Sequence, residues 1–367
     1  MFPIIISGSG YFLPDDIIEN DELVLAFNKY ANKVNMEANM EKIKKSSSEF
    51  IYTASGIKKR HVCDKQGILD EDIMRPMIKR RSNNILSLQA EMAVKAAKHA
   101  LKEANKKPNE IDVVFIACSN MQRSYPAIAI EVQDALNIEG WGVDINVACS
   151  SAIFGISMAA SNIQSNLAKS VLVITPEIYT GHLNFQDRKS HFIFGDGASA
   201  IVVEAKKYCS SNNPYLIINS KLKTKYSNNI RNNFGFLNRS IRDVENNEDE
   251  LLFSQNGKNV RDQIVPLVSD HILEHLNDLN MSAVDIKKIF LHQSNIHMNM
   301  AIAKNVYGRD ANDFEIPHVL DKYGNIGAAG AIITFNKYNK DLLCENYCML
   351  CAYGAGYSVG SIVLKKI

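Results

Sequence analysis

The sequence predicts an α/β fold built from two similar halves, and two observations carry this prediction. First, short apolar runs such as Val113–Ala117 alternate with segments that have the 3.6-residue periodicity of helices. Continuous apolar strands of this kind are typical of a sheet that is covered by helices on both faces. Second, a helix, a strand and a closing Ser-Asn pair occur in this order twice, with the strands at Val114–Asn120 and Ile289–Asn295. A match at so long a period indicates a duplicated unit.

The repeat extends beyond the two strands. Cys149 lies 32 residues after Ala117, and Asn325 lies 33 residues after His292. Each of these two later residues opens a segment of small residues with helical character. The chain therefore predicts two βαβαβ-type units. We assign them to residues 1–210 and 211–367.

The elements of the first half are predicted from periodicity and from turn residues. They are a strand at Ile4–Phe12, a polar helical stretch at 20–48, a helix capped by Ser82–Asn84, a strand at Val113–Ala117, a helix near 126–136, a strand at Gly142–Val147, a helix at Ser150–Gln164, and strands at Val171–Ile174 and Ala200–Val203. The polar stretch at 20–48 is interpreted as a surface elaboration.

The second half begins with a region of low hydrophobicity. Residues 206–250 contain an Asn-rich stretch at Ser227–Asn233 and an acidic run at Glu245–Glu250, so they are expected to form exposed loops. A helix near 260–279 and the strand Ile289–Leu291 come next.

Composition excludes several classes of protein. A chain of 367 residues is long enough for about two domains. Its net charge of +1 signals neither a nucleic-acid partner nor a membrane surface. The N-terminus lacks the basic region and cleavage site of a signal peptide, and no apolar run has the length of a membrane span. Seven scattered cysteines suit reduced thiols, so a cytoplasmic location is expected.

Cys149 is the candidate nucleophile. It stands where a strand ends and a helix begins, and unpaired N–H groups at a helix start favour a thiolate. The small neighbours of Cys149 would let a carbonyl group approach the sulfur, although a buried packing role is the alternative. His292 and Asn325 also stand at a strand end and a helix start, where reacting groups collect in α/β folds. The three residues could form a nucleophile with two neutral hydrogen-bond donors.

Motifs spread over nearly the whole chain carry a resemblance. They are Thr53-x-x-Gly56-Ile57-x-x-Arg60, Asp144-x-x-x-Ala148-Cys149-Ser150, Phe194-Gly195-Asp196-Gly197-Ala198, Gln255-x-Gly257, His292-Gln293-Ser294-Asn295, Gly324-Asn325 and Gly354-Ala355-Gly356-Tyr357. Together they resemble the β-ketoacyl–acyl-carrier-protein synthase III family of the thiolase superfamily. The resemblance implies a thiolase-like, five-layer α-β-α-β-α fold from duplicated halves.

The same resemblance implies an acyltransferase that needs no cofactor and no metal. Cys149 would take an acyl group from acyl-CoA. His292 and Asn325 would bind the thioester carbonyl of malonyl-acyl-carrier protein and stabilise the enolate formed as carbon dioxide leaves. The backbone N–H groups of Cys149 and Ala355 would form an oxyanion hole. A homodimer is expected, with no nucleic-acid or membrane partner.

Substrate-binding positions are also implied by the resemblance. They are Phe50, Tyr125, Gly257 and Asn295. Tyr125 would reach a dimer partner's acyl pocket and limit its length. Ala54 stands where the family has an arginine that pairs with CoA, and His297 stands where it has a basic residue that helps carrier-protein docking. Extra segments near 20–48, 62–82 and 224–250 resemble a longer branch, of the β-ketodecanoyl-acyl-carrier-protein synthase type, with medium-chain, octanoyl-like acyl-CoA primers.

Several alternatives differ by single residues. A thiolase needs a second cysteine at the position of Ala352, and the neighbouring Cys351 would face the other side of a strand. The elongating synthases have a second histidine where this chain has Asn325. Chalcone- or polyketide-type condensing enzymes share Cys-His-Asn and stay open as an alternative. A non-catalytic acyl-binding subunit is the second alternative.

One further motif has a metal-binding pattern. His271 and His275 match the H-x-x-E-H sequence of zinc peptidases. No third ligand is evident, so they are interpreted as two surface histidines on a helix.

Overall fold

The computed structural model describes residues 2–37, 41–240 and 248–367. Its strands are β1 (Ile4–Phe12), β2 (Asp16–Glu19), β3 (Lys59–Val62), β4 (Val113–Ala117), β5 (Trp141–Ile145), β6 (Ser170–Ile178), β7 (Asp196–Ala205), β8 (Tyr215–Ser227), β9 (Ile230–Arg231), β10 (Ser254–Gln255), β11 (Ile286–Leu291), β12 (Tyr347–Gly354) and β13 (Gly356–Lys366). Its α-helices are α1 (Asn20–Met36), α2 (Ser48–Ser55), α3 (Lys65–Leu69), α4 (Leu88–Glu103), α5 (Ile128–Ala135), α6 (Ser151–Gln164), α7 (Gly257–Asp278), α8 (Ile296–Tyr307), α9 (Leu320–Tyr323) and α10 (Ala329–Tyr338).

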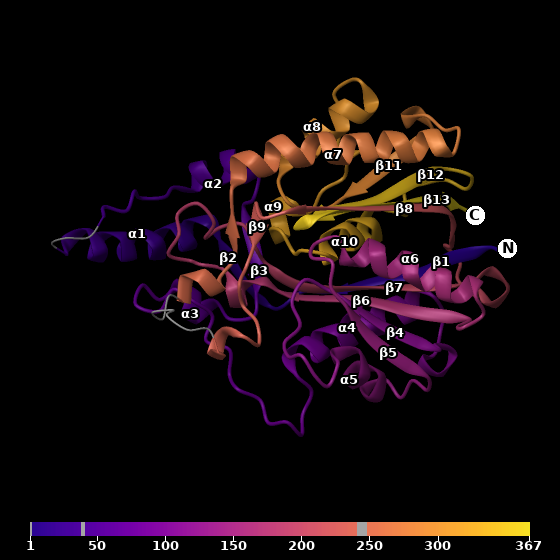
Figure 1. Ribbon diagram of the computed structural model, residues 1–367, viewed down its shortest axis with the longest axis horizontal. Helices are drawn as coiled ribbons and strands as arrows, with labels where there is room; N and C mark the ends of the chain where they lie inside the picture. Colours follow the sequence, from indigo (N-terminus) through magenta and orange to yellow (C-terminus); the bar gives the residue numbers. More distant parts are fainter. Residues whose placement is uncertain (1, 38–40, 241–247) are drawn as a thin grey trace.

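Five layers, α-β-α-β-α, are stacked in the order expected from the sequence (Figure 1). Helices α7 and α8 cover one outer face, α6 and α10 lie in the middle, and α4 and α5 cover the other outer face. Between them the strands run in the order β11-β12-β13-β8-β1-β7-β6-β4-β5. The α/β fold class predicted from the apolar strands is thus confirmed.

The strands between the layers are buried on both faces, as β4 illustrates. Val113, Phe115 and Ala117 pack into the central cluster around α6 and α10. Val114 and Ile116 point the other way and pack against α4 and α5. All five are at most 1% exposed, which explains why the strand is continuously apolar in sequence.

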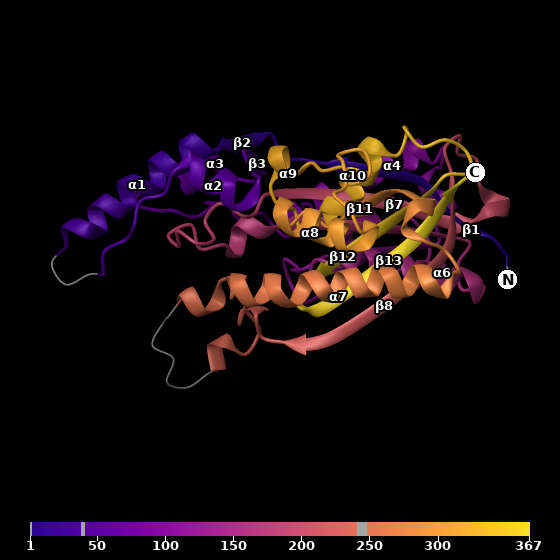
Figure 2. The same cartoon turned by 90° about the horizontal axis from the view of Figure 1, so that it is seen from above.

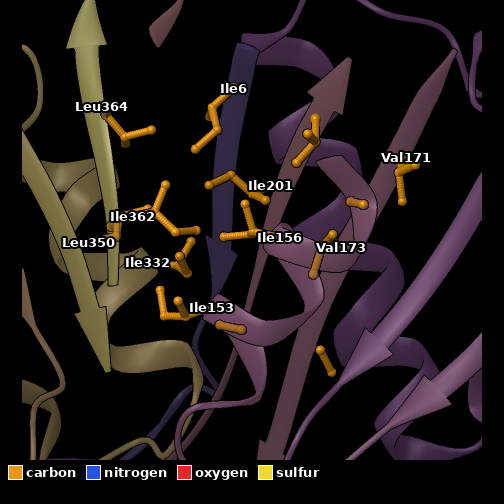
Figure 3. Packing of buried hydrophobic residues seen from close by; sticks show 14 of the residues in the cluster. Ile6, Ile153, Ile156, Val171, Val173, Ile201, Ile332, Leu350, Ile362 and Leu364 are labelled. Atoms are coloured by element: carbon orange, nitrogen blue, oxygen red, sulfur yellow. The ribbon is translucent and has the colours of Figure 1, made fainter. Parts of the chain in front are cut away.

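The central layer holds the two halves together. Ile153 and Ile156 of α6 and Ile332 of α10 meet strand residues from both halves, among them Ile201 and Leu350 (Figure 3). Burying an isoleucine side chain stabilises a fold by about 1.5–3 kcal/mol, so this layer fixes the starts of α6 and α10 relative to each other.

The two halves repeat one path through space. In the first, β4 leads through α5 and β5 to α6, β6 and β7. In the second, β11 leads through α8 to α10, β12 and β13. In both, the final two strands are antiparallel, and the opening strand pairs in parallel with the first of them. The division at residues 210 and 211 stays a prediction, and it falls shortly before β8.

The main error of the sequence-based prediction lies between residues 206 and 250. Instead of loops only, this region contains the 13-residue strand β8, which pairs with β13 along most of its length. Most side chains from Asn219 to Tyr226 are exposed, so the strand has no apolar alternation to reveal it. Residues 241–247, which include part of the predicted acidic run, lie outside the described residues, as do 38–40.

The predicted cap of the fourth helix was also wrong. The helix begins at Leu88, and the Ser87 hydroxyl accepts a hydrogen bond from the Ala90 N–H at 3.2 Å. Ser82–Asn84 lie in a turn upstream of this cap. Serine is a good N-cap at either place, so only the position of the first helical turn decides between them.

The polar stretch after β2 is more buried than expected. Helices α1, α2 and α3 gather at the end of the molecule opposite the two chain termini (Figure 2). Leu23 and Phe27 of α1 are fully buried and belong to a cluster with Phe192 and Phe194. The remaining face of α1 is mostly polar, with Leu25 and Met36 also exposed, and its composition therefore suggested a surface addition. Over the residues that the structure describes, no helix is both long and apolar enough to cross a membrane.

Candidate active site

Cys149 occupies a sharp turn between β5 and α6. The preceding Ala148 has φ of +48°, in the left-handed region that residues with a Cβ rarely adopt. The side chain of Asn146 holds this turn by accepting from the Ala148 N–H at 3.0 Å. Ser151 adds a second restraint, because its Oγ accepts from the Val147 N–H at 2.8 Å. The turn therefore presents Cys149 two residues before the first residue of α6.

The Cys149 thiol is in a more apolar setting than its place near a helix start suggests. Burial raises its pKa to about 12, and a hydrogen bond with Tyr179, whose Oη lies 3.2 Å from Sγ, opposes this only in part. The expectation that helix N–H groups would favour a thiolate is therefore wrong for the resting protein, because desolvation outweighs them. Cys149 is a protonated thiol at neutral pH.

His292 is fixed at the end of β11 by backbone contacts. Its N–H donates to the Cys351 carbonyl at 2.8 Å, and its own carbonyl accepts from the Asn299 side chain at 3.0 Å. The imidazole meets the ring of Tyr353 edge to face, with centroids 5.2 Å apart. Burial lowers the pKa of His292 to about 4. The ring is therefore neutral at physiological pH.

Asn325 is held by both its backbone and its side chain. Its N–H donates to the Ile193 carbonyl at 3.0 Å, and its carbonyl accepts from the Gly195 N–H at 3.1 Å. The side-chain Oδ1 accepts from the Gly327 N–H at 3.0 Å. The amide nitrogen Nδ2 is then the group that can donate to a substrate.

Cys149, His292 and Asn325 line one cavity of about 550 Å³. The aromatic and aliphatic residues of its wall include Phe192, Phe194, Ile230, Phe253, Val260 and Ile264. The Gly354–Ala355 segment closes the wall against Cys149: a Cβ on Gly354 would stand 2.9 Å from the Cys149 backbone nitrogen. Ala355 follows Gly354 and lines the same cavity as Cys149, and the oxyanion hole was expected at the backbones of Cys149 and Ala355.

Three of the four predicted substrate-binding residues also line this cavity, namely Phe50, Gly257 and Asn295. The Asn295 side chain accepts from the His297 N–H and donates to the Ala54 carbonyl, so it caps α8 and ties it to α2. Tyr125 lies elsewhere, 85% exposed, in a second hollow. Its role towards a dimer partner stays a prediction.

Arg188 packs on Phe50, a residue of the cavity wall, and no motif of the sequence pointed to it. Its guanidinium carbon lies 3.8 Å from the ring centroid of Phe50, and its Nε donates to the Lys45 carbonyl at 2.8 Å. This chain has Ala54 where an arginine was expected to pair with CoA. The guanidinium of Arg188 lies instead on the ring of Phe50. Arg188 is 138 residues from Phe50 in the chain, and no local pattern links them.

Behind Cys149 lies a second group of residues that the sequence did not reveal. The hydroxyl of Tyr179 is hydrogen-bonded to the hydroxyl of Ser119, and Ser119 in turn donates to the carboxyl of Glu177 at 3.1 Å. Glu177 is 1% exposed, and burial raises its pKa to about 8. The N–H of Ala328, at the start of α10, also donates to Glu177 at 3.0 Å.

Two other sequence-based interpretations can be compared with the structure. His271 and His275 are not surface residues, as was expected, but are at most 1% exposed and both contact the Ser361 hydroxyl, at 3.0 and 2.6 Å. The polar composition of α7 misled here, because β13 covers the helix on the side of these two rings. Cys351 and Ala352 do face opposite sides of β12, as expected from strand alternation.

Comparisons with known proteins agree with the geometry. Residues 143–225 match the family described as 3-oxoacyl-[acyl-carrier-protein (ACP)] synthase III, and residues 276–366 match its C-terminal counterpart. The chain is 47% identical over 327 residues to a β-ketodecanoyl-[acyl-carrier-protein] synthase of Pseudomonas aeruginosa, and the match covers 89% of this chain and 93% of that protein. It is 28% identical over 367 residues to a β-ketoacyl-[acyl-carrier-protein] synthase III of Caldanaerobacter subterraneus, covering 98% and 97%.

Solved structures share the fold at lower identity. A 3-oxoacyl-(acyl carrier protein) synthase III from Pseudomonas aeruginosa superposes with a TM-score of 0.77 at 22% identity, covering 99% of this chain and 98% of the other. OleA of Xanthomonas campestris, solved with bound lauric acid and lauroyl-CoA, gives a TM-score of 0.76 at 14% identity, covering 99% of both chains.

Proposed function

Because the chain belongs to the 3-oxoacyl-[acyl-carrier-protein] synthase III family, it is a condensing acyltransferase of fatty acid biosynthesis, and we propose that Cys149, His292 and Asn325 carry out its reaction. The reaction joins an acyl group from acyl-CoA to malonyl-acyl-carrier protein. The observation that carries the assignment is that all three side chains line one largely apolar cavity.

In the first half-reaction, Cys149 takes the acyl group. Its sulfur attacks the thioester carbonyl, CoA leaves, and an acyl-cysteine remains. The backbone N–H groups of Cys149 and Ala355 stabilise the oxyanion of the tetrahedral intermediate. The tight contact of Gly354 with Cys149 supports this role, since it holds the two backbone segments together.

In the second half-reaction, His292 and Asn325 activate the malonyl thioester. A neutral His292 and the Nδ2 of Asn325 donate hydrogen bonds to the thioester carbonyl and stabilise the enolate that forms as carbon dioxide leaves. The lowered pKa of His292 supports this role, because a neutral ring can donate from one nitrogen without bringing a positive charge. The enolate carbon then attacks the acyl-cysteine and releases β-ketoacyl-acyl-carrier protein.

We propose a medium-chain primer. The Pseudomonas aeruginosa relative is named for a β-ketodecanoyl product, and condensation with malonyl adds two carbons, so its name implies an octanoyl primer. The apolar wall of the cavity supports a primer with a hydrocarbon chain. Phe50 of the cavity wall and Arg188 form a stacked pair that suits the adenine and phosphates of CoA.

We also propose a cytoplasmic homodimer. Strand β5 lies at the edge of the sheet, and Trp141 on it is 41% exposed beside Val143 at 38%. Unpaired sheet edges with apolar side chains favour pairing with another chain, here a second copy. All seven cysteines are free, which suits a reducing compartment. Light scattering tests the dimer: a monomeric wild type contradicts it, and Trp141→Lys should dissociate it.

Intact-protein mass spectrometry tests the function directly. The wild-type protein is incubated with a set of acyl-CoAs from acetyl to dodecanoyl, and Cys149→Ala serves as the control. We expect one acyl mass, centred on octanoyl, on the wild type alone. An adduct on Cys149→Ala would remove the assignment of the nucleophile. The absence of any adduct, together with full binding of acyl-CoA, would favour a non-catalytic acyl-binding subunit.

A further inference from the structure

The resting state of Cys149 poses a chemical problem that His292 and Asn325 do not solve as hydrogen-bond donors. Its pKa of about 12 means that the thiol must lose a proton before it can attack a thioester. The cavity wall is largely apolar, and a bound acyl-CoA would displace water from it. The thiol proton therefore needs an acceptor within the protein.

A continuous chain of hydroxyl groups leads away from the sulfur. Cys149 Sγ lies 3.2 Å from Tyr179 Oη, Tyr179 contacts the Ser119 hydroxyl, and Ser119 Oγ lies 3.1 Å from Glu177 Oε1. These residues come from three places in the fold: the turn before α6, the end of β6 with the segment after it, and the end of β4. Ser119 is 9% exposed, and Tyr179 and Glu177 are at most 4% exposed, so these three residues are shielded from solvent.

The direction of the hydrogen bonds depends on the protonation of Glu177. An ionised carboxylate can only accept, so it takes the Ser119 O–H and two backbone N–H groups, those of Ser119 and Ala328. Ser119 then accepts from Tyr179, and Tyr179 accepts from the Cys149 thiol. When Glu177 is protonated through this chain, each bond reverses, and Tyr179 donates to a Cys149 thiolate.

We propose that Tyr179 is a further catalytic residue, which donates a hydrogen bond to the Cys149 thiolate after the thiol proton has passed through Ser119 to Glu177. Ser119 and Glu177 act through Tyr179 and are positioning residues. This inference rests on the proposed function, because it assigns to Cys149 the role of nucleophile.

The proton balance closes over the cycle. In acylation the S–H bond of Cys149 breaks, one proton moves along each hydroxyl, and an O–H bond forms on Glu177. The new carbon–sulfur bond replaces the thioester bond to CoA, and the CoA thiolate takes a proton from water. In condensation the Cys149 thiolate leaves the acyl group, and the proton on Glu177 returns along the same chain.

The charged and titratable groups around Glu177 fit an acceptor that titrates near the working pH. Those that face it or Tyr179 are Cys118 after β4, Asp196 on β7 and His182 beyond the Tyr179 ring. Asp196 is engaged by the Thr180 N–H and hydroxyl, at 3.0 and 2.6 Å. The raised pKa of Glu177 suits proton exchange with a weakly acidic thiol.

The test is the pH dependence of Cys149 alkylation by iodoacetamide from pH 6 to pH 10. It is followed by the mass of the peptide that contains Cys149, because all seven cysteines are free thiols. Wild type is compared with Tyr179→Phe, Glu177→Gln and their double variant. Tyr215→Phe is the matched control, because its buried hydroxyl donates to the Asn339 carbonyl away from the cavity. No acyl substrate is needed, so the readout does not depend on the proposed function.

In the wild type we expect the rate to rise with pH and to level off near pH 8, where Glu177 ionises. Glutamine at 177 still accepts from Ser119 but cannot take its proton, so the chain is locked with Tyr179 as acceptor. In both single variants the alkylation rate should then no longer level off near pH 8. At pH 8 both should react roughly ten- to a hundredfold more slowly than wild type, which is the worth of one hydrogen bond to a charged group. The double variant should lose no more, because the residues act as one unit.

Three results would overturn the proposal. Faster alkylation of Glu177→Gln at every pH would mean that the carboxylate acts only by its charge, which raises the pKa of Cys149. An alkylation rate that still levels off near pH 8 in Glu177→Gln would assign the acceptor role to another group. Additive losses in the double variant would mean that the two residues act separately. If Glu177→Gln does not fold, Ser119→Ala interrupts the same chain and is held to the same outcomes.

The two proposals fail in different ways. Alkylation that follows the expected profiles, with no acyl adduct from any acyl-CoA, would reject the proposed function and keep the proton path. An acyl adduct on the wild type, with unchanged alkylation of Tyr179→Phe, would support the proposed function and reject the proton path.

Discussion

Gly327 and Tyr179 are packed so closely that a Cβ on the glycine would lie 2.1 Å from the ring carbon Cε2 of the tyrosine. The same Cβ would lie 2.9 Å from a carboxyl oxygen of Glu177. Gly327 lies two residues after Asn325 and belongs to the second half of the chain, whereas Tyr179 and Glu177 belong to the first. The start of α10 thus presses on the residues behind the nucleophile of the other half.

Gly327→Ala should therefore lower the reactivity of Cys149 without changing a residue of the cavity wall. The added methyl group must push the Tyr179 ring away from Sγ, and the φ of +48° adds about 1–2 kcal/mol of backbone strain for a residue with a Cβ. We expect folded protein, a loss in acyl transfer of roughly tenfold or more, and a lower melting temperature. Calorimetry and the rate of acyl-enzyme formation measure the two effects.

Gly235→Ala is the control for this substitution, because nothing lies within 4 Å of a Cβ at that position and its φ is not positive. Equal rates of acyl transfer in Gly327→Ala and Gly235→Ala would show that the contact with Tyr179 does not matter for the reaction.

Much of the fold and part of the site could be predicted from the sequence, because the signals are local. Strand β4 is apolar throughout since both of its faces are covered, and the repeat linked Cys149 with Asn325 through nearly equal spacing from equivalent strands. The pairing of Arg188 with Phe50 and of Tyr179 with Cys149 has no such local signal. These contacts join segments that are distant in the chain, and each residue type is also common on ordinary surfaces or in ordinary cores.

We expect Arg188 to bind the CoA part of the primer and not its acyl group. Its guanidinium stacks on Phe50 of the cavity wall, and a stack of this kind is worth about 0.5–2 kcal/mol. Arg188→Ala should raise KM for octanoyl-CoA roughly three- to thirtyfold and leave kcat nearly unchanged. Initial rates with octanoyl-CoA measure both constants.

The comparison substrate for Arg188→Ala is octanoyl-N-acetylcysteamine, a thioester without the nucleotide. Wild type and variant should use it equally well. A similar loss with both thioesters would place Arg188 in support of the acyl pocket instead of the CoA site.

His292→Ala should separate the two half-reactions. Its ring is neutral and is predicted to donate to the malonyl thioester, so its removal should slow decarboxylation by about 10²–10³ and leave acylation of Cys149 almost intact. Release of carbon dioxide and the mass of the acyl-enzyme report on the two steps. If His292→Ala also fails to become acylated, the imidazole takes part in the first half-reaction, as the acceptor of the thiol proton.

The buried pair His271 and His275 should make the protein sensitive to mild acid. Burial lowers the pKa of each to about 4, and the proximity of the two rings adds to this for His271. In the unfolded chain both have a pKa of about 6.5, so the unfolded state binds more protons as the pH falls from about 6.5 towards 4. The stability that depends on these two rings is therefore full above about pH 6.5 and is lost progressively below it.

Urea unfolding of His271→Gln/His275→Gln at fixed protein concentration tests this acid sensitivity. The slope of the unfolding free energy against pH should be shallower than in wild type by up to about two protons over this window. The variant is expected to be less stable than wild type at pH 7, because the contacts with Ser361 change, so the slope and not the absolute stability decides the question. An unchanged slope would assign the acid sensitivity to other histidines, such as the half-buried His182 and the buried His191, whose pKa values desolvation also lowers to about 4.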